Sequence, residues 1–294
     1  MSDSMESLRR KISSAGELQS VVRTMKAMAA SSIGQYENAV RSLDDYYQTV
    51  QLGLSACLLQ TQPQAESASA MREETGAIGA VVFGSDQGLV GQFNDLMVEF
   101  VINRLENLPG KKIIWAVGER IQSRFESVDL VPGAHFVLPN TIGAITPLVG
   151  QILMEIETQR EQGAIDQVYL FYHRPQSRAV YLPVSQRLLP LDDTWRRDLE
   201  AIAWPTRYLP EVLNRGEGAL LAMVREYIFV SLFRACAESL ASENASRLLA
   251  MQRAEKNIDE LLEDLNQGYH RLRQGTIDAE LFDLVSGFEA LTKI

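Results

Sequence analysis

Cysteine and histidine are scarce in this sequence. Only two cysteines and three histidines occur among the 294 residues. Cys57 and Cys236 lie far apart, and each falls within a helical pattern. We therefore expect buried, reduced thiols instead of a disulfide framework, which indicates a reducing compartment. His135, His173 and His270 lie in unrelated segments without metal-ligand spacing, which argues against a bound metal.

The sequence also lacks long apolar runs and an excess of positive charge. No run approaches the roughly 20 apolar residues that a membrane-spanning helix needs, so we expect contact with a membrane only through partner proteins. The first ten residues have neither the apolar core of a signal peptide nor the arginine-rich character of a transit peptide. A net charge of −10 argues against nucleic acid or an anionic membrane surface as the main partner.

Proline is absent from both ends of the chain. None precedes Pro63 and none follows Pro210, so nothing there forces a break in a helix. At both ends apolar residues recur at steps of three or four, over 8–54 and over 241–272, with Glu255 as the exception. A stripe this narrow is typical of a helix that meets one partner helix along a seam.

Two such helices at opposite ends of one chain predict a long antiparallel two-helix coiled coil, with the middle of the chain at one end of it. At 1.5 Å per residue, roughly 60–75 residues make a rod about 90–110 Å long, too long to be buried in a domain of this size. Gly16 and Gly34 each weaken an isolated helix by about 1 kcal/mol relative to alanine. We therefore expect neighbours to support the coil.

The middle of the chain changes from helical spacing to short apolar runs. Such runs are typical of strands covered on both faces, and helical segments separate them, which predicts an α/β layer. Asn94 is a candidate helix cap, Thr146 a candidate helix start and Gly163 a candidate helix stop. Residues 192–210 are interpreted as a return loop. The expected strands cover 78–83, 113–117 and 168–172, with a hairpin partner at 179–184.

These patterns predict an α/β fold in which the N- and C-terminal helices form a long antiparallel coiled coil around an inserted α/β domain. The expected parts are an N-terminal coiled-coil helix (1–60), a linker (61–75), an α/β domain (76–210) and a C-terminal coiled-coil helix (211–294).

The strongest candidate for chemistry is the glycine-rich turn at 84–94. Such a turn between a strand and a helix can hold phosphate on backbone amides. However, its glycines are not in the G-x-G-x-x-G register, and no Lys-Ser/Thr pair makes it a Walker loop. We favour a tight strand-to-helix turn in which Asp86 forms local hydrogen bonds. No serine or cysteine lies in a nucleophile-elbow context, so hydrolase chemistry has no support.

Three runs at the two ends of the chain form a recognisable set. They read RRKISS (9–14) with VRTMKAMAAS (22–31), LASENASRLLAM (240–251), and RQGTIDAEL (273–281) with LVSG (284–287). Their order and separation closely resemble the signatures of the gamma subunit of F-type ATP synthases. The resemblance implies a Rossmann-like domain between the coil helices. It also implies a non-catalytic central-stalk rotor subunit that couples ion flow to ATP synthesis or hydrolysis, with no cofactor.

The same resemblance implies partners and a location. The partners are the alpha and beta subunits of the catalytic ring, an epsilon-type subunit and the membrane ring of c-type subunits. The implied location is peripheral, on the cytoplasmic face of a prokaryotic plasma membrane, with membrane contact only through partner subunits.

Six residues are subunit contacts by matching motif. Met25 falls in the shaft segment that faces the nucleotide-binding ring. Arg247, Arg273 and Gln274 fall where the family's shaft pairs with the mobile C-terminal loop of the beta subunit, and a guanidinium fork suits a carboxylate there. The alternative for Arg247 is a solvated helix residue paired with Glu243 four positions earlier. The full set is Met25, Arg247, Arg273, Gln274, Asp278 and Glu280.

The chain departs from the family pattern at several positions. Asp278 stands where many relatives have a hydroxyl residue, and Lys26 stands where an acidic residue is common. These departures leave the driving ion, H⁺ or Na⁺, open. Two other functions also stay open at this point: a non-rotary coiled-coil interaction scaffold, and a nucleotide-binding regulator centred on residues 84–94.

Overall fold

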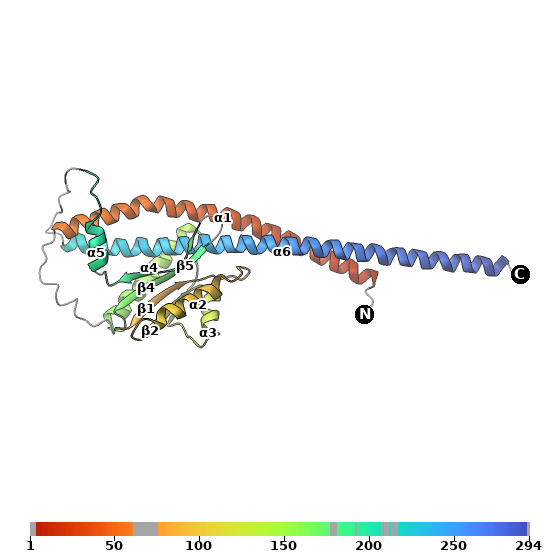
Figure 1. Ribbon diagram of the computed structural model, residues 1–294, viewed down its shortest axis with the longest axis horizontal. Helices are drawn as coiled ribbons and strands as arrows, with labels where there is room; N and C mark the ends of the chain where they lie inside the picture. Colours follow the sequence, from red (N-terminus) through yellow and green to blue (C-terminus); the bar gives the residue numbers. More distant parts are fainter. Residues whose placement is uncertain are drawn as a thin grey trace. The chain divides into compact units, whose positions relative to one another are not determined.

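The computed structural model describes residues 4–60, 76–176, 181–191, 193–206, 208, 212 and 217–292. Contacts divide the chain into two compact units. One contains Met1–Ala29 and Leu248–Ile294, and the other contains Ala30–Arg247. Two long helices, α1 (Met5–Gln60) and α6 (Glu217–Thr292), each contribute to both units (Figure 1). The expected linker at 61–75 lies outside the described residues, and the four-part division of the chain stays a prediction.

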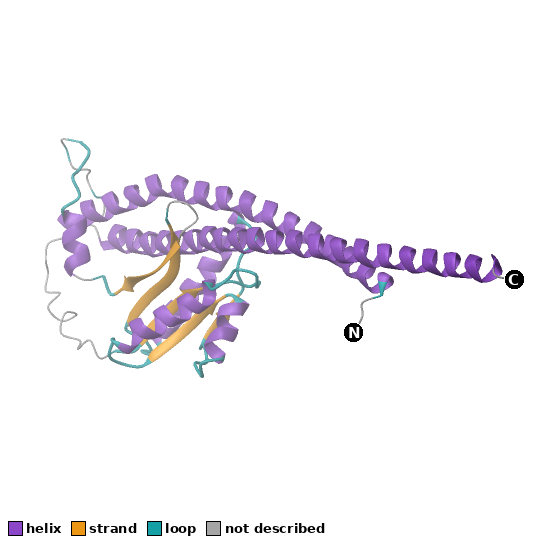
Figure 2. Cartoon of the chain, turned by 45° about the vertical axis from the view of Figure 1, so that its right-hand side comes forward, coloured by secondary structure: helices purple, strands orange, loops and turns teal. Residues whose placement is uncertain are grey.

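The unit that holds both ends of the chain is an antiparallel helix pair. Along α1 the buried residues recur at every seventh position: Leu8, Ala15, Val22 and Ala29. Met251 and Ile258 of α6 are buried in the same apolar cluster as Val22. A seven-residue repeat is the pattern of a coiled-coil seam, and Figure 2 shows the two helices of this unit side by side. The predicted pairing of the two terminal helices is confirmed.

The pairs that cross this seam define its register. The side chain of Gln19 donates a hydrogen bond to Asp259, while Arg23 Nε donates to Glu255 Oε1 at 2.9 Å. By that register Met5, the first residue of α1, falls opposite Arg273. The last part of α6 therefore continues past the start of α1 and has no α1 residue beside it.

Glu255, the polar exception in the α6 stripe, has its partners on α1. Its carboxylate accepts from Lys26 Nζ at 2.5 Å and from Arg23 Nε at 2.9 Å. The hydrogen bond from Lys26, followed by that from Arg23, lowers the pKa of the Glu255 carboxyl. Because alanines occupy two of the four buried α1 positions, apolar burial is modest here, and the ion pairs add orientation to a weak seam.

The second unit contains a five-stranded sheet in the order β3-β2-β1-β4-β5. The first four strands are parallel, and β5 joins β4 as an antiparallel hairpin partner. The predicted α/β fold class and the three apolar strands are confirmed, whereas β3 was not foreseen because it is only three residues long. The bounds are β1 (Ile78–Phe83), β2 (Lys112–Val117), β3 (Ala134–Phe136), β4 (Gln167–Pro175) and β5 (Tyr181–Leu189).

Both faces of the sheet are covered by helices. Helices α2 (Phe93–Glu106) and α3 (Glu119–Glu126) bury one face, where they pack on alternate residues of β1. The other face packs against α4 (Ile145–Glu161) and against the parts of α1 and α6 that belong to this unit. Apolar residues on both sides explain why the strands are continuous apolar runs and do not alternate. Parts of α1 and α6 are therefore built into the core of this unit.

Three local predictions can be compared with the structure: Gly163 as a helix stop, Asn94 as a helix cap, and residues 192–210 as a return loop. Gly163 ends α4 as predicted: its φ is +68°, and Ala164 N donates to Gln159 O at 2.9 Å, as in a Schellman motif. The prediction of Asn94 as a helix cap is wrong, because α2 begins at Phe93 and Asn94 lies inside its first turn.

The expected return loop at 192–210 is wrong in part, because Asp193–Glu200 form the helix α5. A short 3₁₀ turn, η2 (Ile142–Ala144), precedes α4.

The ion pairs of Glu255 generate a testable expectation for the helix pair. Glu255→Lys places a third positive charge beside Arg23 and Lys26, so we expect a lower melting temperature of the α-helical signal by circular dichroism. Reversing all three charges, with Arg23→Glu and Lys26→Glu added, restores opposite signs and should recover most of the loss. Exposed Lys256→Glu, which reverses a charge outside the seam, is the control. A triple variant no more stable than Glu255→Lys would contradict the role of the pairs.

Candidate functional site

The carboxyl end of β1 is where a sheet of this order would bind a ligand. The strand order reverses between β1 and β4, and open α/β sheets bind ligands in the crevice outside the strand ends at such a reversal. The glycine-rich turn at 84–94 follows β1 and leads into α2. What fills this crevice therefore decides between a nucleotide site and a structural joint.

Polar groups of the turn are used within the protein. Ser85 N donates to Asn94 Oδ1 at 3.0 Å, and Asn94 Nδ2 donates to Ser85 Oγ at 2.8 Å. Asp86 accepts from two backbone amides: Glu119 N, at the start of α3, at 2.9 Å, and Leu138 N at 3.2 Å. Asp86 thus caps a neighbouring helix and holds the segment after β3. The expected tight turn agrees with these contacts, but the prediction that Asp86 forms local hydrogen bonds is wrong, because its two partners lie 33 and 52 residues away along the chain.

The three glycines of the turn differ in the space around them and in their backbone conformation. A Cβ on Gly84 would lie 2.2 Å from Ile121 Cβ and 2.9 Å from Asn94 Oδ1. Gly91 has a φ of +58°, in the left-handed region that favours glycine. A Cβ on Gly88 would meet nothing within 4 Å. Close packing against α3 therefore fixes the first glycine, and backbone geometry favours the third.

Helix α6 contacts the same edge of the sheet with two buried serines one helical turn apart. Ser242 Oγ lies 3.1 Å from the carbonyl oxygen of His173, at the end of β4. Ser246 Oγ donates to Val90 O at 2.5 Å and lies 3.0 Å from the hydroxyl of Tyr181 on β5. Both serines are at most 6% exposed. The crevice beside the turn is therefore occupied by the protein's own C-terminal helix.

His173 is a buried structural side chain beside this contact. Its ring lies 4.2 Å from that of Phe93 and 4.8 Å from that of Tyr181, centroid to centroid, and its Nε2 donates to Phe93 O at 2.9 Å. Burial is the main cause that lowers the pKa of His173 to about 4, so the ring is neutral at physiological pH. Within the part of the chain that the structure describes, no group of three potential ligands could hold a metal.

Arg247 lies at the end of the same contact and is turned inward. Its Nη2 donates to Glu243 Oε1 at 2.6 Å, and the two side chains are only 11% and 7% exposed. Burial raises the pKa of the Glu243 carboxyl, Arg247 opposes this rise, and the charge of Asp86 adds to it. The pairing with Glu243 that was one interpretation of Arg247 is present, but the arginine is not solvated.

The other predicted contact residues all lie in the helix-pair unit. Met25 is half-buried against the seam formed by Val22, Met251 and Ile258. The remaining four lie on the last part of α6 and have exposed side chains: Arg273, Gln274, Asp278 and Glu280.

The exposed apolar residues beyond them are also part of this segment. Phe282 and Leu284 are 73% and 71% exposed, and Leu281 and Val285 are about half exposed. A stripe this apolar would be unusual on a helix without a partner.

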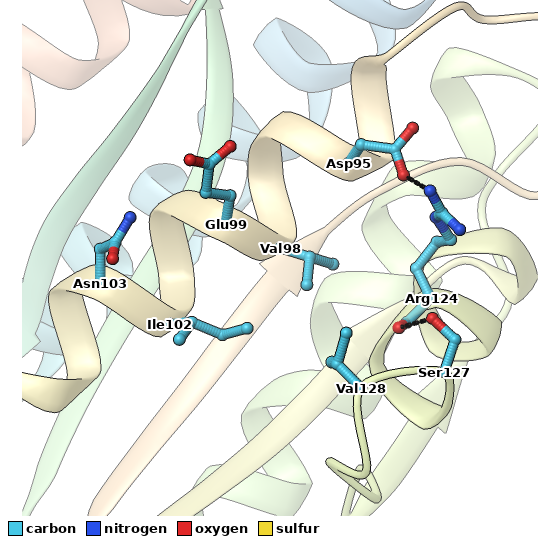
Figure 3. A pocket seen from close by; sticks show the side chains of 8 residues that line it. All are labelled: Asp95, Val98, Glu99, Ile102, Asn103, Arg124, Ser127 and Val128. Atoms are coloured by element: carbon cyan, nitrogen blue, oxygen red, sulfur yellow. Dashed lines mark hydrogen bonds and ion pairs between the residues drawn. The ribbon is translucent and has the colours of Figure 1, made fainter.

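A hollow lies between α2 and α3 (Figure 3). Val98, Ile102 and Val128 form apolar walls, and Arg124 reaches from α3 to pair with Asp95 on α2. It holds no nucleophile beside a base, so it offers no catalytic arrangement.

Sequence reasoning did not single out the serine contact or this hollow. The only signal for the serines was their four-residue spacing in α6, which also fits intrahelical bonding.

Among the described parts of the chain, no helix is both long enough and apolar enough to cross a membrane.

Comparisons with known proteins give a consistent result. The family model described as ATP synthase matches residues 4–291. The ATP synthase gamma chain of Polynucleobacter asymbioticus is 26% identical over 98% of this chain and 99% of the relative. That of Cupriavidus necator is 27% identical over 97% of this chain and 98% of the relative.

Solved structures support the fold. The mitochondrial ATP synthase rotor of Euglena gracilis aligns with a TM-score of 0.67 at 17% identity, over 93% of this chain and 98% of that one. A chain from the OSCP/F1/c-ring structure of the same organism aligns with a TM-score of 0.69 at 18% identity, over 98% and 94%.

Close packing at Gly84 predicts a sharp difference between two glycines of one turn. Gly84→Ala forces its methyl group onto Ile121, and we expect it to lower the free energy of unfolding by about 3 kcal/mol. Gly88→Ala, four residues away with open space around it, should change that free energy by less than about 0.5 kcal/mol. Urea unfolding followed by tryptophan fluorescence measures both. Equal effects of the two substitutions would contradict the packing argument.

The pKa of His173 predicts a pH dependence of stability. The unfolded chain binds a proton at this histidine below about pH 6.5, whereas the folded chain does so only below about pH 4. The contribution of His173 to the free energy of unfolding, up to about 3 kcal/mol, is therefore complete above pH 6.5 and is lost as the pH falls toward 4.

His173→Gln keeps a side-chain donor for Phe93 O and should flatten the fall of the unfolding free energy between pH 6.5 and 4. His135→Gln, at an exposed histidine, is the control. A slope in the His173 variant as steep as that of the unmodified chain would contradict this account.

Proposed function

The chain belongs to the gamma-subunit family of the F-type ATP synthases, and from that premise we propose how its own residues do the work of a rotor. It is a non-catalytic central-stalk subunit, which couples the ion-carrying membrane part of the complex to the catalytic ring. The observation that carries the proposal is the antiparallel pairing of the two ends of one chain, with α6 continuing past α1.

The mechanism follows from the asymmetry of the helix pair. The helix pair presents different side chains on different sides of its axis. Helix α1 exposes the apolar Leu18, Val21 and Met28, whereas α6 exposes the acidic Glu260 and Glu263. Three catalytic subunits surrounding such a shaft meet different faces, so each is biased toward a different nucleotide affinity. Turning the shaft exchanges these states, which is coupling between sites through a shared element.

The ring contacts are assigned to the exposed end of α6 and to one residue of α1. Arg273, Gln274, Asp278 and Glu280 have solvent-facing side chains that can reach a surrounding subunit. Met25 contributes from the seam, where a partner would touch only its outer edge. Arg247 takes part only when its pair with Glu243 opens, because its guanidinium is otherwise engaged.

The partners follow from the family. They are the alpha and beta subunits around the shaft, an epsilon-type subunit and the c-type ring at the α/β unit. The chain is peripheral to the membrane and reaches it through these subunits. The two relatives named above, which match over nearly their full length, are bacterial, and this supports a place on the cytoplasmic face of the plasma membrane.

The nucleotide-binding alternative has lost its main support, because Ser246 and the polar groups of the turn occupy the crevice. An experiment distinguishes the scaffold alternative from the rotor function. Complexes reconstituted with and without this chain are compared for ion-driven ATP synthesis. We expect synthesis only when the chain is present, and coupled synthesis in its absence would overturn the rotor assignment.

Arg273 offers a sharper test of the contact assignment. In the reconstituted complex, Arg273→Ala should reduce ion-driven synthesis about fivefold, the lower end of typical coupling between sites. Arg271→Ala removes another exposed arginine two residues away, on another side of the helix, and should have little effect. If both variants synthesised ATP at the unmodified rate, Arg273 would not be a ring contact.

A further inference from the structure

A buried carboxylate in the α/β unit joins three elements of the fold. Glu238 on α6 is 3% exposed. Its Oε2 accepts a hydrogen bond from Arg174 Nε, at the end of β4, at 3.1 Å, and its Oε1 accepts from Arg234 Nε, one turn earlier on α6, at 2.7 Å. Arg234 Nη1 lies 3.2 Å from Asp44 Oδ1 on α1. The four charges alternate in sign from α1 through α6 to the sheet.

Two tyrosines hold the arginines in place. Arg174 Nη2 donates to the hydroxyl of Tyr172 at 2.5 Å, and its guanidinium lies 5.6 Å from the centroid of the same ring. The guanidinium of Arg234 lies 5.6 Å from the centroid of the Tyr47 ring on α1. Both guanidiniums are therefore fixed in orientation by an aromatic face as well as by a carboxylate.

Stability alone does not account for this arrangement. A buried carboxylate loses its hydration, and well-packed apolar residues of similar volume are often at least as stable as a buried ion pair. The surrounding core of Leu232, Ala235 and Leu240 already supplies apolar burial between α6 and the sheet. Apolar contact is non-directional, whereas hydrogen bonds to charged groups weaken steeply when their geometry changes. The buried carboxylate of Glu238 and the arginines that bond to it therefore fix direction more than they add stability.

We propose that Glu238, with Arg174, Arg234 and Asp44, is the joint that holds both shaft helices at a fixed orientation on the sheet, so that torque passes between them without slip. Glu238 acts as a positioning residue and touches no nucleotide. The inference rests on the rotor function proposed above, and it assigns the transmission of torque within the α/β unit to one set of charges.

The test uses the whole complex. Glu238→Gln keeps the shape of the side chain and removes the charge. We expect ATP hydrolysis without an opposing ion gradient to stay near the unmodified rate, while ion transport per ATP hydrolysed against a gradient falls about fivefold. Glu226→Gln is the control, because Glu226 also lies on α6 and, among the residues that the structure describes, its carboxylate accepts from Tyr46 of α1 and not from the sheet.

A substitution at Arg174 tests the same joint with less disturbance of the fold. Its side chain is half exposed, so Arg174→Gln should fold even if Glu238→Gln does not. Arg174→Gln should lose coupling under load, and Arg174→Lys, which keeps the charge, should recover part of it. A role in stability alone would lower the melting temperature and leave transport per ATP unchanged.

The proposal of this joint would be wrong if folded Arg174→Gln and Glu238→Gln complexes kept the unmodified ion transport per ATP against a gradient. It would also be wrong if Glu226→Gln lowered that ratio as much as Glu238→Gln does. These results leave the rotor function intact as long as complexes without the chain remain uncoupled. Coupling in complexes without the chain would instead remove the rotor function and this inference with it.

Discussion

The pairing of α1 with α6 is the constraint on which the rest of the structure depends. Each helix carries a narrow apolar stripe that its own backbone cannot cover, and the two stripes lie at opposite ends of the sequence. The seam is sparse, since Ala15 and Ala29 fill positions where leucine would bury more surface. Polar pairs between Arg23, Lys26 and Glu255 supply orientation that small apolar residues cannot.

The sequence predicted those elements whose cause is local. Apolar runs located β1, β2 and β4 because strands buried on both faces need no polar alternation. The absence of proline allowed two helices of 56 and 76 residues. Gly163 ended α4 because a left-handed residue was needed there. The family resemblance, which rests on motifs at both ends, supplied the function.

Partners from distant parts of the chain could not be predicted in the same way. Glu255 looked like a flaw in the stripe because Lys26 lies 229 residues away along the chain. Asn94 was predicted to be a helix cap, but its side-chain oxygen accepts from the amide of Ser85 and its side-chain nitrogen donates to the hydroxyl of the same residue. Arg247 fitted a surface contact as well as an internal pair, and only the fold showed how deeply its carboxylate partner is buried.

The use of the sheet edge connects these observations. In a ligand-binding α/β domain the strand ends face a small molecule, and mobile polar groups close around it. Here the same edge faces α6, whose Ser242, Ser246 and Glu238 bond to the backbone or side chains of the strands and the turn. The helix that covers the edge supplies Ser242 and Ser246 as partners for the carbonyl oxygens of His173 and Val90. In this chain the edge is a packing surface whose contacts with α6 are buried, and shielding from solvent suits them to the mechanical joint proposed above.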